Sequence, residues 1–167
     1  MTELPSSLRG RVLVAGAGVS GRGCVAMLAS LGVDTTVADS NETALAELAE
    51  EFGVATVSVD SAAQGEFDLV VTSPGWRPDS PLLVALQDAG VEVIGDVELA
   101  YRLDRAGVFG APRTWLVVTG TNGKTTTTGM LAQIMQADAQ RTGKRALAVG
   151  NIGVSLFDAL TATPRVD

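Results

Sequence analysis

The sequence predicts an α/β protein built on a parallel, doubly wound sheet, and three observations support that prediction. Short apolar runs alternate with longer stretches of helical pattern along the 167 residues. Two of these runs lead directly into glycine-rich turns, each followed by a helical stretch. Hydrophobic residues make up 46% of the chain, which is enough for a core. The repeated strand–helix–strand order implies parallel strands joined by right-handed crossovers.

The first elements follow from periodicity and composition. Val12–Ala15 is expected as a buried strand ending in glycines, and Gly21–Leu31 as the helix after it. Thr35–Ala38 is expected as a second strand. Asn41–Glu51 is rich in helix formers, and its first residue or the serine before it can serve as the N-cap.

Three further strands and two helices are expected before the pattern breaks. Val54–Val59 has small residues and is expected at a sheet edge, and Asp68–Thr72 is expected as the next strand. Pro81 is the first residue of a helix, which suits its fixed φ, and that helix ends at a glycine. Val91–Ile94 is expected as the fifth strand and Asp96–Leu103 as the following helix.

A linker near Gly107–Pro112 combines glycine and proline with little periodicity. We therefore expect two domains, a Rossmann-like domain over residues 1–108 and the start of a P-loop-type domain over 109–167. The elements expected after the linker are the strands Trp115–Thr119 and Ala146–Val149 and the helices Lys124–Ala137 and Ser155–Leu160.

Composition excludes several classes of function. The net charge of −7 argues against nucleic-acid and anionic-membrane partners, because both select basic surfaces. No apolar run approaches the roughly 18 residues of a membrane span. The one cysteine, Cys24, is expected as a buried hydrophobe and fits a reducing cytoplasm. The chain has no histidine, so these residues cannot complete a histidine-dependent mechanism.

The first glycine turn, GAGVSG at residues 16–21, matches the dinucleotide-binding pattern G-x-G-x-x-G. The glycines allow a tight turn, close approach of a phosphate and close packing of the helix, whose N-terminus presents free N–H groups. Asp39 follows the second strand, where dinucleotide folds place a ribose-binding carboxylate. Taken alone, this unit suggests NAD, although the identity of its ligand stays open.

The second glycine turn, GTNGKT at residues 120–125, is a shortened P-loop in which Val118 takes the place of the usual first glycine. Its backbone N–H groups can still form an anion nest. Lys124 can lie along the β- and γ-phosphates, and the Thr125 hydroxyl can bind Mg²⁺. We therefore expect ATP at this turn.

These motifs together resemble the Mur ligases, which form amide bonds with ATP in peptidoglycan synthesis. GTNGKTTT followed by GNIG carries that resemblance. GAGVSGRG, VADS, VTSPG and VIGDVELAYR, in this order, look like the members that add D-glutamate. The resemblance covers essentially the whole chain and implies UDP-N-acetylmuramoyl-L-alanine, D-glutamate and ATP as substrates, with Mg²⁺ as a cofactor.

The resemblance also implies roles for individual residues. It places the UDP-sugar at Gly18, Val19, Ser20, Asp39, Ser40, Ser73, Gly75 and Asn151. It places ATP at Gly120, Thr121, Asn122, Gly123, Lys124, Thr125, Thr126 and Thr127. Within the ATP set, Lys124 and Thr125 are the expected catalytic residues, and Thr125 is the expected metal ligand.

The family's magnesium-binding glutamate, its histidine, its carbamylated lysine and its third domain all follow GNIG beyond Asp167. We therefore expect this chain to be an inactive N-terminal fragment of a cytoplasmic, monomeric enzyme without membrane insertion. An NAD(P)-dependent oxidoreductase and a non-catalytic UDP-sugar-binding module remain as alternatives. Trp76 follows SPG, and its side chain can either contact a ligand or cap its own loop.

Overall fold

The computed structural model describes residues 4–150 and 154–167. Its centre is a five-stranded parallel sheet with the strand order β3-β2-β1-β4-β5. The strands are β1 (Val12–Ala15), β2 (Thr35–Ala38), β3 (Ala55–Val57), β4 (Leu69–Thr72) and β5 (Glu92–Gly95). The predicted parallel α/β sheet is confirmed, and β3 lies at an edge as expected.

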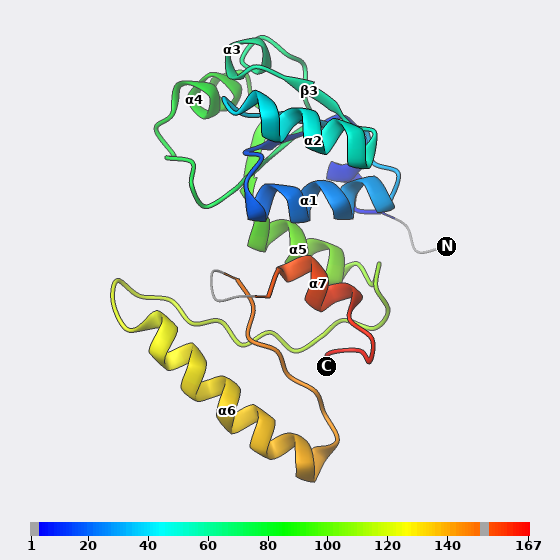
Figure 1. The fold of residues 1–167 in the computed structure, drawn as a ribbon, viewed down its shortest axis with the longest axis vertical. Coiled ribbons are helices and arrows are strands. Elements are labelled where there is room, and N and C mark those ends of the chain that lie inside the picture. Colours follow the sequence, from blue (N-terminus) through cyan, green and yellow to red (C-terminus); the bar gives the residue numbers. More distant parts are fainter. Residues whose placement is uncertain (1–3, 151–153) are drawn as a thin grey trace.

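Helices cover both faces of the sheet (Figure 1). The helices α1 (Val19–Ser30), α2 (Glu42–Phe52) and α5 (Asp96–Arg105) pack on one face, while α3 (Val59–Ala62) and α4 (Pro81–Asp88) pack on the other. A short 3-10 helix, Ser6–Leu8, precedes β1. The chain order reverses beside β1, so right-handed crossovers place α3 and α4 on the opposite face from α1 and α2. Helix α5, which follows the edge strand β5, packs back on the face of α1.

The central strand β1 contributes to both hydrophobic cores. Val12 and Val14 belong to the cluster under α1 and α5, whereas Leu13 and Ala15 belong to the cluster under α4. All four are fully buried, because successive side chains of a strand point to opposite faces and both faces are covered.

Local capping explains where the helix and strand boundaries fall. Of the two predicted N-cap candidates, Ser40 and Asn41, it is Asn41 that caps α2, and its Oδ1 accepts from Ala44 N at 3.1 Å. The third strand ends before the predicted Val59, because Ser58 Oγ accepts from Ser61 N at 3.2 Å and starts α3. Helix α1 begins at Val19, somewhat earlier than predicted.

Past the linker, both helices form but the predicted strands do not. Helix α6 (Lys124–Thr142) runs beyond the predicted Ala137 to a left-handed glycine cap. The prediction of strands at Trp115–Thr119 and Ala146–Val149 is wrong for this structure. A strand needs a neighbour for its backbone hydrogen bonds, and these segments instead line one apolar hollow of about 280 Å³.

Helix α7 (Leu156–Thr161) packs beside α1 and α5 rather than beside α6 (Figure 1). Its Phe157 and Leu160 belong to the core under α1 and α5. Helix α6, by contrast, has no buried residue. Within residues 4–150 and 154–167, no helix has both the length and the hydropathy to cross a bilayer.

Candidate functional site

The first glycine turn joins β1 to α1 at the carboxyl ends of the strands. Gly16 has φ of +112°, a backbone conformation that favours glycine. A Cβ on Gly21 would overlap the carbonyl oxygen of Gly16. The first and third glycines therefore let α1 approach the strand end closely, as the motif predicts.

The turn after β4 stands next to the first glycine turn. The β1 and β4 strands are neighbours, and the chain order reverses between them, which is the topological switch point where α/β sheets bind ligands. Ser73 fixes the second turn to the first, because its N and Oγ both donate to Ala15 O, at 3.1 and 2.7 Å. Gly75 has open space where a side chain would be.

Asp39 braces the glycine turn from the end of β2. Its Oδ2 accepts from Ala17 N at 2.7 Å, and its Oδ1 accepts from Asn41 N at 2.9 Å. Both oxygens therefore bind the protein's own backbone. Asp39 and Ser40 also line a hollow of about 650 Å³ that reaches the β3–α3 turn.

The free donors of the first turn lie at its helical end. Gly16 N donates to Ala38 O at 2.9 Å, and Ala17 N is taken by Asp39. Over the described part of the chain, the amides of Gly18, Val19 and Ser20 have no hydrogen-bond acceptor. Nothing lies near a Cβ built on Gly18, and Val19 is 87% exposed. This end of the turn is open to an anion.

The second glycine turn forms the N-terminus of α6. Gly120 and Gly123 have φ of +143° and +76°, and Gly123 caps the helix. Lys124 Nζ donates to the carbonyl oxygens of Gly120 and Thr121. The ammonium thus lies over the mouth of its own loop. The whole set of predicted ATP residues, 120–127, is exposed and gathered at one helix end.

The sequence-predicted residues therefore form two groups. The structure brings Gly18, Val19, Ser20, Asp39, Ser40, Ser73 and Gly75 to one edge of the sheet. Asn151 lies outside the described residues. In the described residues no cluster of three histidine, cysteine, aspartate or glutamate side chains is placed to hold a metal.

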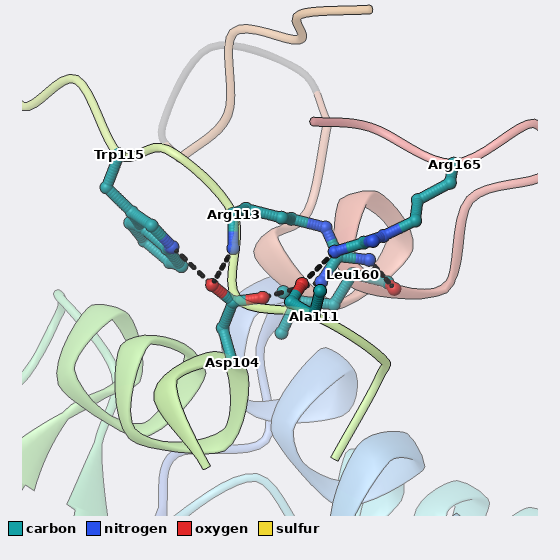
Figure 2. Close-up of polar contacts among 6 residues, drawn as sticks. All are labelled: Asp104, Ala111, Arg113, Trp115, Leu160 and Arg165. Carbon is teal, nitrogen blue, oxygen red and sulfur yellow. Dashed lines mark hydrogen bonds and ion pairs between the residues drawn. The ribbon is translucent and has the colours of Figure 1, made fainter. Parts of the chain in front are cut away.

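A buried ion pair, which the sequence analysis did not predict, ties the segment after the linker to helix α5 (Figure 2). Asp104 is 0% exposed and accepts from Arg113 N at 2.9 Å, Arg113 Nη1 at 2.6 Å and Trp115 Nε1 at 2.9 Å. Arg113 Nη2 donates to Leu160 O of α7 at 2.6 Å. Arg165 donates to Ala111 O nearby. We call Asp104, Arg113 and Trp115 the Asp104 cluster.

The donors keep Asp104 ionised. Burial raises its pKa, but the hydrogen bonds from the Trp115 indole and from Arg113 outweigh burial and leave the pKa below its usual value. A sequence signal for this cluster exists, because Asp104 follows Ala100 by one helical turn on the buried face of α5. A charge on such a face needs a partner.

Family models match both parts of the chain. A model of the Mur ligase MurD-like N-terminal domain matches residues 10–95, and a model of the Mur ligase middle domain matches residues 118–164.

Two curated relatives resemble the chain over nearly all its length. The UDP-N-acetylmuramoylalanine--D-glutamate ligase of Corynebacterium diphtheriae is 63% identical over 163 residues, covering 96% of this chain and 34% of that protein. The same enzyme of Corynebacterium efficiens is 59% identical over 169 residues, covering 100% of this chain and 35% of that protein. The chain thus spans about a third of the length of these relatives.

Among solved structures, UDP-N-acetylmuramate-alanine ligase from Thermotoga maritima is similar with a TM-score of 0.49 and 24% identity. That match covers 76% of this chain and 29% of that chain.

Proposed function

The chain belongs to the Mur ligase MurD-like family, and from this premise we propose that the whole protein is an ATP-dependent ligase that adds D-glutamate to UDP-N-acetylmuramoyl-L-alanine. The two relatives described above carry that activity in their names. One observation carries the proposal: a chain of this family has two separate glycine turns, and each turn leads into a helix whose N-terminus is open. The use of ATP and the reduced Cys24 favour a cytoplasmic location.

The first turn is the proposed site for the UDP part of the sugar substrate. The free amides of Gly18, Val19 and Ser20 supply donors for the diphosphate at the positive end of α1. Ser73 and Gly75 border the same crevice. The hollow beside Asp39 and Ser40 is proposed to take the uracil, and Asn151 is proposed to contact the rest of the substrate.

The second turn is the proposed ATP site, and its residues fit a triphosphate. Gly120 and Gly123 have positive φ, and Lys124 already lies over the loop. Main-chain amides in turns of this kind can form an anion nest. A phosphate would replace the loop carbonyls as the partner of the Lys124 ammonium. The Thr125 hydroxyl is the proposed ligand in this chain for Mg²⁺, which would neutralise phosphate charge when bound.

The proposed reaction has two steps. A carboxylate oxygen of the sugar substrate attacks the γ-phosphorus of ATP, which forms an acyl phosphate and releases ADP. The amine of D-glutamate then attacks the acyl carbon. A C–N bond forms, the nitrogen loses a proton, and the acyl C–O bond breaks as inorganic phosphate leaves. Lys124 acts in the first step, where its positive charge stabilises the transferring phosphoryl group. The first turn holds the substrate in place, which orients its carboxylate.

Two other functions make different predictions. An NAD(P)-dependent oxidoreductase would use Asp39 on the ribose, but Asp39 is hydrogen-bonded to the backbone of Ala17 and Asn41. It would also leave the second turn without a role. A non-catalytic UDP-sugar-binding module would bind UDP but would not need Lys124.

We also propose that the chain divides into two domains, residues 1–108 and 109–167, and that α7 of the second packs on the first.

Ligand-dependent thermal stability tests the proposal, because a ligand that binds the native state raises the melting temperature. UDP-N-acetylmuramoyl-L-alanine, UDP, NAD and ATP with Mg²⁺ are compared on the same 167-residue chain. We expect both uridine compounds to stabilise it and NAD to have no effect. A shift with NAD and none with the uridine compounds would reverse the assignment.

A further inference from the structure

The indole N–H of Trp76 is an unpaired donor beside the first glycine turn. We propose that it donates a hydrogen bond to the diphosphate of a uridine diphosphate ligand, which makes Trp76 an additional binding residue. This inference rests on the proposed UDP-sugar site and adds one side chain to it.

The backbone near Gly16 has no donor left for a phosphate. Gly16 N donates to Ala38 O, and Ala17 N donates to Asp39 Oδ2 at 2.7 Å. The free amides begin only at Gly18, toward the helix. A diphosphate seated across the turn therefore lacks a main-chain donor at its Gly16 side.

Trp76 supplies the missing donor from the neighbouring strand end. A Cβ built on Gly16 would lie 3.1 Å from Trp76 Nε1, so the polar edge of the indole faces Gly16. Among residues 4–150 and 154–167, Nε1 has no hydrogen-bond partner, and it is not one of the buried unpaired atoms. An indole has no acceptor and only this one donor, which suits an anion.

The ring is held in place before any ligand binds. Trp76 is half-buried and packs against the core under α4. Its backbone N donates to Ser73 O at 3.1 Å, which closes the turn, and Ser73 is itself bonded to Ala15 O. A donor fixed in this way binds without the loss of rotamer freedom that a flexible side chain would incur.

The chain contains two tryptophans, and each variant leaves one as a probe. Trp115→Phe leaves only Trp76, and Trp76→Phe leaves only Trp115. UDP and uridine are titrated into wild type and both variants, with tryptophan emission and calorimetry as readouts. Circular dichroism checks that each variant is folded. The Trp115→Phe titration needs no change at position 76, so it stands even where Trp76→Phe is unstable.

We expect UDP to change the emission of the Trp115→Phe variant and to leave that of Trp76→Phe unchanged. Losing one hydrogen bond to a charged group should weaken UDP binding to Trp76→Phe about tenfold. Uridine, which has no phosphate, should bind wild type and Trp76→Phe equally.

The inference would be overturned if UDP binds by calorimetry without changing the emission of Trp76, and if Trp76→Phe binds UDP as tightly as wild type. The proposed function would then still stand. An equal loss for UDP and uridine would also overturn it, because the ring would then contact the nucleoside. Absence of UDP binding to wild type would overturn both.

Discussion

Replacing Asp104 with asparagine removes the negative charge from the centre of the Asp104 cluster while keeping the shape of the side chain. The Arg113 side chain is 7% exposed, and its Nε already has no partner in the described structure. The variant therefore leaves a buried guanidinium without a charged partner, although Leu160 O still accepts from it. Removing one member of a buried ion pair costs about 3–5 kcal/mol.

That cost is large compared with the stability of a small domain, which is about 5–15 kcal/mol. With a urea m-value of about 2 kcal/mol/M, the unfolding midpoint should fall by about 2 M. The assay is urea unfolding followed by circular dichroism. Asp138→Asn is the matched control, because Asp138 pairs with Arg141 on the surface at 2.8 Å and such pairs contribute about 0–1 kcal/mol.

If Asp104→Asn lowers the midpoint no more than Asp138→Asn does, the buried ion pair does not stabilise the fold as proposed. A second variant separates the charge from the packing. Replacing both Asp104 and Arg113 by leucine and methionine leaves no unpaired charge, so it should recover much of the loss.

Four further predictions follow from named contacts. Hydrogen-bond donors hold the pKa of Asp104 below its usual value, so its contribution to stability is present above about pH 4 and is lost as the pH falls through the lowered pKa. When unfolding is measured against pH, Asp104→Asn should lack this acid-dependent loss of stability. Gly21→Ala should lower stability by about 1–3 kcal/mol through overlap with the turn, whereas Gly18→Ala, which faces open space, should leave the melting temperature nearly unchanged. Burial, assisted by a nearby carboxylate charge, raises the pKa of the Cys24 thiol, so a thiol reagent such as dithionitrobenzoate should react with it only after unfolding. Lys124→Met should weaken ATP binding by calorimetry at least tenfold and leave UDP binding unchanged, since the two turns are separate.

Local patterns in the sequence were enough to predict the sheet and to predict that the residues proposed for the first site lie together at one edge of it. Buried parallel strands such as β1 appear as continuous apolar runs, and the glycine turn after β1 marks the switch point. Side chains that follow the strands, such as Asp39 and Ser73, meet at one edge because all strands are parallel. Their proximity therefore follows from strand order alone.

Contacts between distant segments could not be read in the same way. The segment 115–119 has the apolar composition of a strand, but a strand forms only where a neighbour is available. The partners of Asp104 are Arg113 and Trp115, which follow the linker, and nothing in the local pattern of α5 identifies them. The hydrogen bond from Ala17 N to Asp39 could not be predicted, because the residue type at position 39 does not show whether its carboxylate is free or already bonded to the backbone.

Isothermal titration calorimetry of UDP, without ATP and with saturating ATP and Mg²⁺, tests directly whether the two turns bind different phosphate ligands. We expect one UDP site with the same stoichiometry in both titrations and no displacement of UDP by NAD. Loss of UDP binding when ATP is saturating, or displacement of UDP by NAD, would contradict it.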